Sequence, residues 1–82
     1  MRVEIDKKAQ KDYISLSSEA KERIKKALLE LKEFPNVSNI KKLSNYDPAY
    51  RKRVGDYRIL FDVFDDLLTI YEILHRKEAY DK

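Results

Sequence analysis

The chain has 82 residues, of which 40% are charged, and its formal net charge at pH 7 is +3. This length supports one hydrophobic core but not two, so we expect a single domain over residues 1–82, with any functional site on its surface. The sequence has no cysteine, signal peptide or long apolar run, which excludes a disulfide framework and a membrane role and predicts a cytoplasmic protein.

The first predicted elements are a short strand and a short helix. Val3 and Ile5 alternate with charged residues over residues 2–6, which predicts a strand with one buried face. Apolar residues at helical spacing then predict a helix from Lys7 to Leu16, and Ser17–Ser18 interrupts this pattern.

A second, longer helix follows the two serines. Ser18 is the predicted N-cap, and Glu19 places negative charge in the first turn, where the helix dipole favours it. Pro35 is expected to fix the end of the helix, because proline cannot continue the backbone hydrogen bonds. One apolar stripe predicts that the helix packs on one side only, and it consists of Ala20, Ile24, Ala27, Leu28, Leu31 and Phe34.

The second half of the chain predicts a loop and then three strands. Asn36–Asp47 contains few apolar residues and is predicted to be a connecting loop. The strands are joined by the short turns Gly55–Asp56 and Asp65–Asp66, which predict an antiparallel meander. We therefore expect an α+β fold of order βααβββ, with an N-terminal strand and a helical hairpin packed on a small antiparallel sheet. The three predicted strands are Tyr50–Val54, Tyr57–Phe64 and Leu67–Leu74.

Several standard kinds of active site are excluded by composition. A single glycine excludes a glycine-rich phosphate loop, and neither HExxH nor CxxC occurs, so we expect no cofactor and no metal. His75 is the only histidine, and the nearby carboxylates are limited to Glu78 and Asp81. The serines lie at predicted helix ends or in the loop, where helix capping is their usual role.

Basic residues are concentrated in the middle and at the end of the chain. A solvated charged face is the simplest interpretation of such a pattern. The predicted meander, however, places Arg51 and Arg53 on one face of a strand, with Arg58 at the start of the next strand and the segment from His75 to Tyr80 leaving the last one. The full set of candidate residues is Lys41, Lys42, Arg51, Lys52, Arg53, Arg58, His75, Arg76, Lys77 and Tyr80.

These residue types fit the recognition and cleavage of RNA. Guanidinium groups match phosphate oxygens, and tyrosine or histidine rings stack on unpaired bases. RNA carries its own nucleophile, the 2′-hydroxyl, so its cleavage requires a proton acceptor, cations for the phosphorane and a proton donor. A histidine changes protonation near neutral pH, and Tyr80 can donate a proton, while Arg58 and Arg76 can hold transition-state charge.

The stretch from Tyr50 to Tyr80, YRKRVGDYRILFDVFDDLLTIYEILHRKEAY, resembles the RelE/ParE toxin superfamily. Members of this superfamily have a basic strand, a G-x-YR-aliphatic strand and an ending of the form HR-x-x-x-Y. The resemblance implies a RelE-like fold and a role as the toxin of a type II toxin–antitoxin system. It further implies that this toxin is a ribosome-dependent, metal-independent endoribonuclease that cleaves mRNA. It also implies a cognate antitoxin that covers the basic site.

The resemblance also implies a role for each matching residue. Arg58, His75, Arg76 and Tyr80 correspond to catalytic positions. Arg51 and Arg53 correspond to the basic-strand positions that bind RNA. The basic pattern of the chain adds Lys41, Lys42, Lys52 and Lys77 as expected RNA- and phosphate-binding residues.

The proton acceptor stays open at the level of sequence, and so do two alternatives to the ribonuclease. Ribonuclease members of the superfamily carry lysines where this chain has Arg51 and Arg53, so His75 or Lys52 is the candidate proton acceptor. The ParE branch shares the fold but blocks DNA gyrase without cutting RNA. The other alternative to the ribonuclease is an inactive protein with the toxin fold that only binds a partner.

Overall fold

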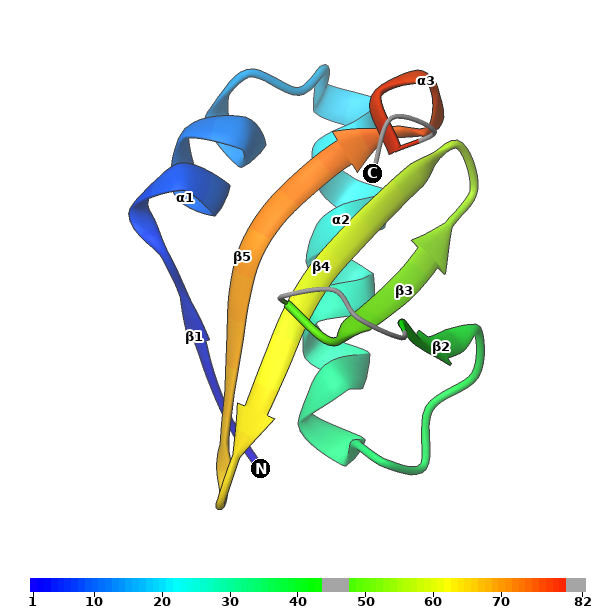
Figure 1. The fold of residues 1–82 in the computed structure, drawn as a ribbon. Helices are drawn as coiled ribbons and strands as arrows, with labels where there is room; N and C mark the ends of the chain where they lie inside the picture. Colours follow the sequence, from blue (N-terminus) through cyan, green and yellow to red (C-terminus); the bar gives the residue numbers. More distant parts are fainter. Residues whose placement is uncertain (44–47, 80–82) are drawn as a thin grey trace.

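The computed structural model describes residues 1–43 and 48–79, which form a layer of helices against a sheet (Figure 1). The predicted α+β class is confirmed. In chain order the elements are β1 (Arg2–Ile5), α1 (Lys7–Ile14), α2 (Ser18–Glu30), the 3-10 turn η1 (Leu31–Glu33), β2 (Ile40–Lys42), β3 (Tyr50–Val54), β4 (Tyr57–Phe64), β5 (Leu67–His75) and α3 (Arg76–Ala79).

The strands of the described residues form one five-stranded sheet in the order β1-β5-β4-β3-β2. The predicted antiparallel meander of β3, β4 and β5 is confirmed. β1 pairs in parallel with β5, from Arg2 opposite Leu67 to Ile5 opposite Ile70. The strand that begins the chain therefore lies beside the last strand, and the helical hairpin crosses one face of the sheet between them (Figure 1).

The hydrophobic core lies between the helices and this face of the sheet. Ala9 from α1 and Ile24, Ala27 and Leu31 from the second helical segment are buried, as the apolar stripe predicts. Five strand residues on the facing side are also buried in this core: Ile59, Phe61, Leu68, Ile70 and Ile73. The opposite face of the sheet is therefore the place where charged side chains can gather.

The helix α2 begins one residue earlier than the sequence analysis proposed. Ser17, not Ser18, is the N-cap: its backbone is extended, and its side chain accepts a hydrogen bond from the amide of Ala20 at 3.2 Å. The helix continues into η1, and Phe34 then packs edge-on against Phe61, with ring centroids 5.7 Å apart. The predicted end of the helical segment before Pro35 is confirmed.

The prediction of a loop over Asn36–Asp47 is wrong for part of its length. Residues 44–47 lie outside the described part of the chain, but Ile40–Lys42 forms β2, the edge strand beside β3. Three residues are too few for an alternating pattern to be recognised in the sequence. The strand exists because β3 offers backbone partners and because Ile40 packs against the core.

One irregularity in the sheet determines which residues face the candidate site. Leu60 lies opposite Glu72, but the next residue, Phe61, lies opposite Ile70, so Tyr71 is an extra residue in β5. The bulge reverses the alternation of side chains along β5. Ile70 and Ile73 consequently both face the core, although they are three residues apart.

Candidate active site

The helix-free face of the sheet brings together basic side chains from three strands. Arg53 lies directly opposite Arg58 in the pairing of β3 with β4, and Arg51 is two residues before Arg53 on the same face. Lys41 of β2 lies opposite Arg51 and extends this cross-strand row. The sequence-based prediction that Arg51 and Arg53 share a face is therefore confirmed, and the register places Arg58 beside them.

Apolar residues lie among these cations. Leu60, opposite Arg51, is 6% exposed, and Leu74, opposite Arg58, is 5% exposed, although neither belongs to the main core cluster. Long arginine stems commonly cover such apolar surface while their charged ends stay accessible. In the described part of the chain, Arg51 Nε is a buried nitrogen without a hydrogen-bond partner. The surface formed by Arg51, Arg53 and Arg58, here called the arginine face, is thus partly shielded from water.

The turn between β3 and β4 fixes two arginines at one end of the sheet. Arg58 Nη1 donates hydrogen bonds to the carbonyl oxygens of Gly55, at 3.0 Å, and Tyr57, at 2.9 Å. The amide of Arg76 donates to the carbonyl oxygen of Asp56 at 2.6 Å, and its guanidinium lies 3.8 Å from the Asp56 carboxylate. Gly55 permits this turn because its φ is +58°, a conformation that other residues rarely adopt.

His75 lies at the same end of the sheet, but its side chain is on the opposite face from Arg58. It pairs with Tyr57, whose ring it meets edge-on at 5.4 Å between centroids, whereas Leu74 pairs with Arg58. Its Nδ1 accepts a hydrogen bond from the amide of Lys77 at 3.3 Å. His75 is therefore close in sequence to Arg76 yet is not part of the arginine face.

Two of the other lysines predicted from sequence also lie away from the arginine face. Lys52 is 3% exposed, and its Nζ donates to the carbonyl oxygen of Ser38 at 3.0 Å on the helix-facing side of β3. Lys42 pairs with Tyr50, and its Nζ lies 6.0 Å from the centroid of that ring. Lys77 is exposed in α3, after the end of β5. Tyr80 lies outside the described residues.

Glu72 is a residue near the site that the sequence analysis missed. Regular alternation along β5 would place it on the same side as Leu68 and Ile70, in the core. Because of the bulge at Tyr71, Glu72 instead lies opposite Leu60, on the arginine face. No local sequence signal marks this bulge, so only the pairing of β4 with β5 identifies the carboxylate.

The described residues contain neither a metal-binding cluster nor a membrane-spanning helix. No group of three or more histidine, cysteine, aspartate or glutamate side chains is arranged to hold a metal ion within residues 1–43 and 48–79. In that same part of the chain, no helix has both the length and the apolar character needed to cross a membrane.

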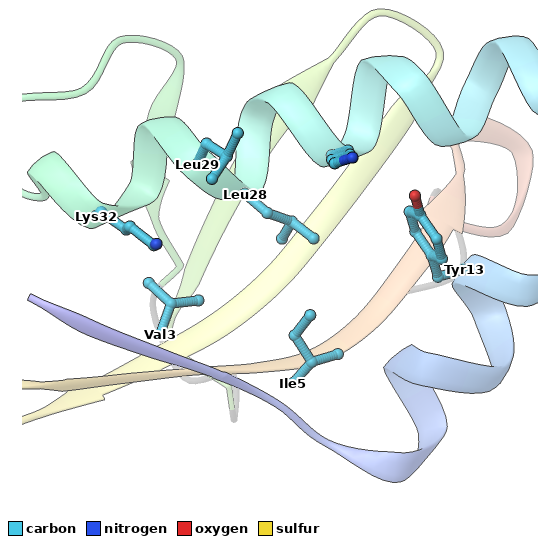
Figure 2. A pocket seen from close by; sticks show the side chains of 7 residues that line it. Val3, Ile5, Tyr13, Leu28, Leu29 and Lys32 are labelled. Atoms are coloured by element: carbon cyan, nitrogen blue, oxygen red, sulfur yellow. The ribbon is translucent and has the colours of Figure 1, made fainter.

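An apolar groove lies away from the arginine face, between β1 and the helical hairpin (Figure 2). It has a volume of about 350 Å³. Val3 and Ile5 of β1 face Leu28 and Leu29 of α2 across the groove, and Leu29 is 55% exposed. The groove offers mainly apolar contact area. Its other lining residues are Tyr13, Lys25 and Lys32.

A helical hairpin over a five-stranded sheet is the fold of solved RelE toxins. The family model described as ParE toxin of type II toxin–antitoxin system, parDE, matches residues 3–80, and the chain belongs to this family. The RelE/ParE membership inferred from the motifs between Tyr50 and Tyr80 is thereby confirmed.

Individual relatives support the same assignment. Toxin RelE3 of Methanocaldococcus jannaschii is 34% identical over 99% of this chain and 97% of its own length. The mRNA interferase toxin RelE of Escherichia coli K12 is 28% identical over 98% of this chain and 90% of its own length. The crystal structure of the RelB-RelE antitoxin-toxin complex from Methanococcus jannaschii contains a chain that is 32% identical, with a TM-score of 0.79 and 95% of each chain covered.

Proposed function

We propose that this toxin is a ribosome-dependent endoribonuclease that cleaves mRNA without a metal ion. The observation that carries the proposal is the direct cross-strand pairing of Arg53 with Arg58, with Arg51 on the same face. Adjacent arginines repel each other, so such a cluster is stabilised by a polyanion whose phosphates lie between the guanidinium groups. The E. coli relative named an mRNA interferase gives independent support for RNA as that polyanion.

The reaction uses the 2′-hydroxyl of the RNA as its nucleophile. The 2′-oxygen attacks the adjacent phosphorus, the bond to the 5′-oxygen breaks, and a 2′,3′-cyclic phosphate is left on the upstream product. Arg58 and Arg76 stabilise the additional negative charge of the phosphorane, since both are fixed at the β3–β4 turn. Tyr80 is the proposed donor of a proton to the departing 5′-oxygen.

Two side chains are candidates for the group that accepts the 2′-hydroxyl proton. His75 is at the end of β5, and Glu72 is on the arginine face. Lys52 is not a candidate, because its ammonium is buried on the helix-facing side of β3 and bound to Ser38. Single-turnover cleavage by His75→Gln and Glu72→Gln distinguishes the two, because only loss of the acceptor removes most of the rate.

Inhibition of DNA gyrase is the second candidate function, because the matching family model is that of the ParE toxin. The test is induction of the toxin in cells, followed by primer extension on abundant mRNAs and measurement of the DNA-damage response. Cuts within translated codons that disappear in Arg58→Ala support the ribonuclease. A DNA-damage response without cuts refutes it and favours gyrase inhibition.

A cognate antitoxin is the proposed protein partner, as in the RelB-RelE complex of the archaeal relative. An acidic segment of the antitoxin would cover the arginine face, and an apolar segment would occupy the groove of Figure 2, where Leu29 is exposed and Lys25 and Lys32 provide positive charge. Replacing Leu29 with aspartate should weaken the complex without changing cleavage by the free toxin. An unchanged affinity would exclude the groove as a contact.

A further inference from the structure

A second cationic site lies on the other side of β3, between that strand and α2. It is a hollow of about 310 Å³ near the β3–β4 turn. Arg23 and Lys26 of α2 and Lys52 and Arg53 of β3 line it, together with a single carboxylate, that of Glu30. Because the side chain of Arg53 is on the helix-free face and Arg23 also pairs with Glu19, three cations meet two carboxylates at this hollow, whereas the groove of Figure 2 is lined mainly by apolar residues.

The buried ammonium of Lys52 is the strongest sign that this hollow accepts an anion. The residue is 3% exposed, and its Nζ donates one hydrogen bond, to the neutral carbonyl oxygen of Ser38. Among the described residues, no carboxylate lies within ion-pairing distance of it. A buried charge is costly unless an opposite charge accompanies it, so an anion bound in the hollow would remove an existing penalty.

Arg23 is held at the edge of the same hollow. Its Nη2 donates to Glu19 Oε1 at 3.0 Å, one helical turn earlier. Its Nη1 lies 3.8 Å from the position that a Cβ atom on Gly55 would occupy, so the guanidinium is next to the β3–β4 turn. The guanidinium is exposed, and its donors other than Nη2 can bind the oxygens of a phosphate.

We propose that this hollow binds a backbone phosphate of RNA, next in line to the phosphate held by the arginine face. Arg53 lies at the boundary between the two places, because its side chain is on the helix-free face beside Arg58 while the residue also borders the hollow. The segment before β2 stays bonded to β3 as far as the Arg53 amide, which donates to the carbonyl oxygen of Asn39, and beyond it an RNA strand can pass over the β3–β4 turn from one face to the other. This inference rests on the proposed RNA-directed function, and the phosphate belongs either to the mRNA or to ribosomal RNA.

The chemistry of the lining favours a phosphate over an acidic peptide. Apart from Ala27 and Val54, the residues that line the hollow are polar, charged or glycine, so a peptide would bury little apolar area there. Peptide docking normally depends on such area in addition to charge. A phosphate needs only cations and hydrogen-bond donors, which Arg23, Lys26 and Lys52 supply.

The test compares two double variants that each remove two positive charges from α2 and the turn that follows it. R23Q/K26Q changes the hollow, and K25Q/K32Q changes the flank of the apolar groove on the same helical segment. All four side chains belong to exposed residues, so both variants should fold, which circular dichroism verifies. Binding of a fluorescent single-stranded RNA is measured by anisotropy between about 50 and about 200 mM potassium chloride.

For R23Q/K26Q we expect a roughly tenfold loss of RNA affinity at low salt. The slope of log affinity against log salt concentration should also become shallower by about 0.7 for each phosphate that the variant no longer neutralises. K25Q/K32Q should retain the wild-type slope. If R23Q/K26Q binds free RNA normally but vacant ribosomes weakly, the proposal also holds, and the phosphate belongs to ribosomal RNA. Equal losses in the two variants overturn it, because net charge would then be the cause. Loss of antitoxin binding with normal binding to RNA and ribosomes overturns it as well.

These measurements need no cleavage, so they are independent of the proposed enzymatic activity. If the wild-type protein binds RNA with the expected slope but never cuts mRNA, the proposed function fails and the phosphate site stands. If cleavage occurs and depends on Arg58, while R23Q/K26Q binds RNA and ribosomes as the wild type does, the phosphate site fails and the proposed function stands.

Discussion

Replacing Arg58 with alanine should reduce catalysis far more than stability. In the folded protein, Arg58 Nη1 donates hydrogen bonds to the carbonyl oxygens of Gly55 and Tyr57. The side chain is half-buried, and hydrogen bonds of this kind contribute modestly once competition with water is counted, so the variant should lose about 1 kcal/mol of unfolding free energy. For a domain of this size that loss lowers the Tm by about 4–8 °C.

The expected effect on the reaction is larger. Removing one preorganised donor that contacts transition-state charge typically lowers the rate by about 10²–10³-fold, which corresponds to about 2.7–4 kcal/mol. The assay is single-turnover cleavage of mRNA on programmed ribosomes, with the Tm of each variant measured in parallel. Arg58→Lys should recover part of the rate, because lysine keeps the charge but not the planar fork of donors.

Arg2→Ala is the matched control for charge. Arg2 is also an arginine in the sheet, but it lies in β1 at the other edge, where its exposed side chain contacts Asp66 at 3.6 Å. This variant should stay folded, since exposed ion pairs contribute little to stability. It should also cleave like the wild type, because Arg2 is at the other edge of the sheet from Arg58. Equal cleavage rates in folded Arg58→Ala and Arg2→Ala would refute the assignment of Arg58 to the reaction.

Three further predictions test the fold and the rest of the site. Ser17→Ala should cost about 1 kcal/mol in urea unfolding, whereas Ser18→Ala should be nearly neutral, because Ser17 caps α2; equal losses would contradict the cap. Ile24→Ala should cost about 2–5 kcal/mol, because Ile24 is fully buried in the core; a loss below this range would mean that the site repacks. Arg76→Ala should keep a near-normal Tm, because its ion pair with Asp56 is exposed, but should lose growth inhibition; a toxic, folded variant would remove Arg76 from the mechanism.

Local sequence signals were sufficient for most elements of the fold. The two helices and the β3–β4–β5 meander follow from apolar periodicity and from the short turns at Gly55–Asp56 and Asp65–Asp66. β2 did not follow, because a strand of three residues is created by its partner rather than by its own pattern. The parallel pairing of β1 with β5 was also not predictable, since alternation identifies a strand but not its neighbour.

The candidate site was predictable only in part. The sequence alone placed Arg51 and Arg53 on one face, because β3 is regular and alternation is then reliable. It grouped Lys52 with them as a phosphate-binding residue, although alternation sends that side chain towards α2, and the structure adds that the ammonium is almost fully buried there.

The sequence by itself determined the family, the order of the main elements and the basic character of the central strands, since each depends on local composition and periodicity. The tertiary structure decided which side chains of β5 face the arginines. The extra residue at Tyr71 moves Glu72 to the arginine face and His75 to the side of Tyr57. A bulge arises from the competition between backbone pairing and core packing across two strands, and neither strand carries that information alone.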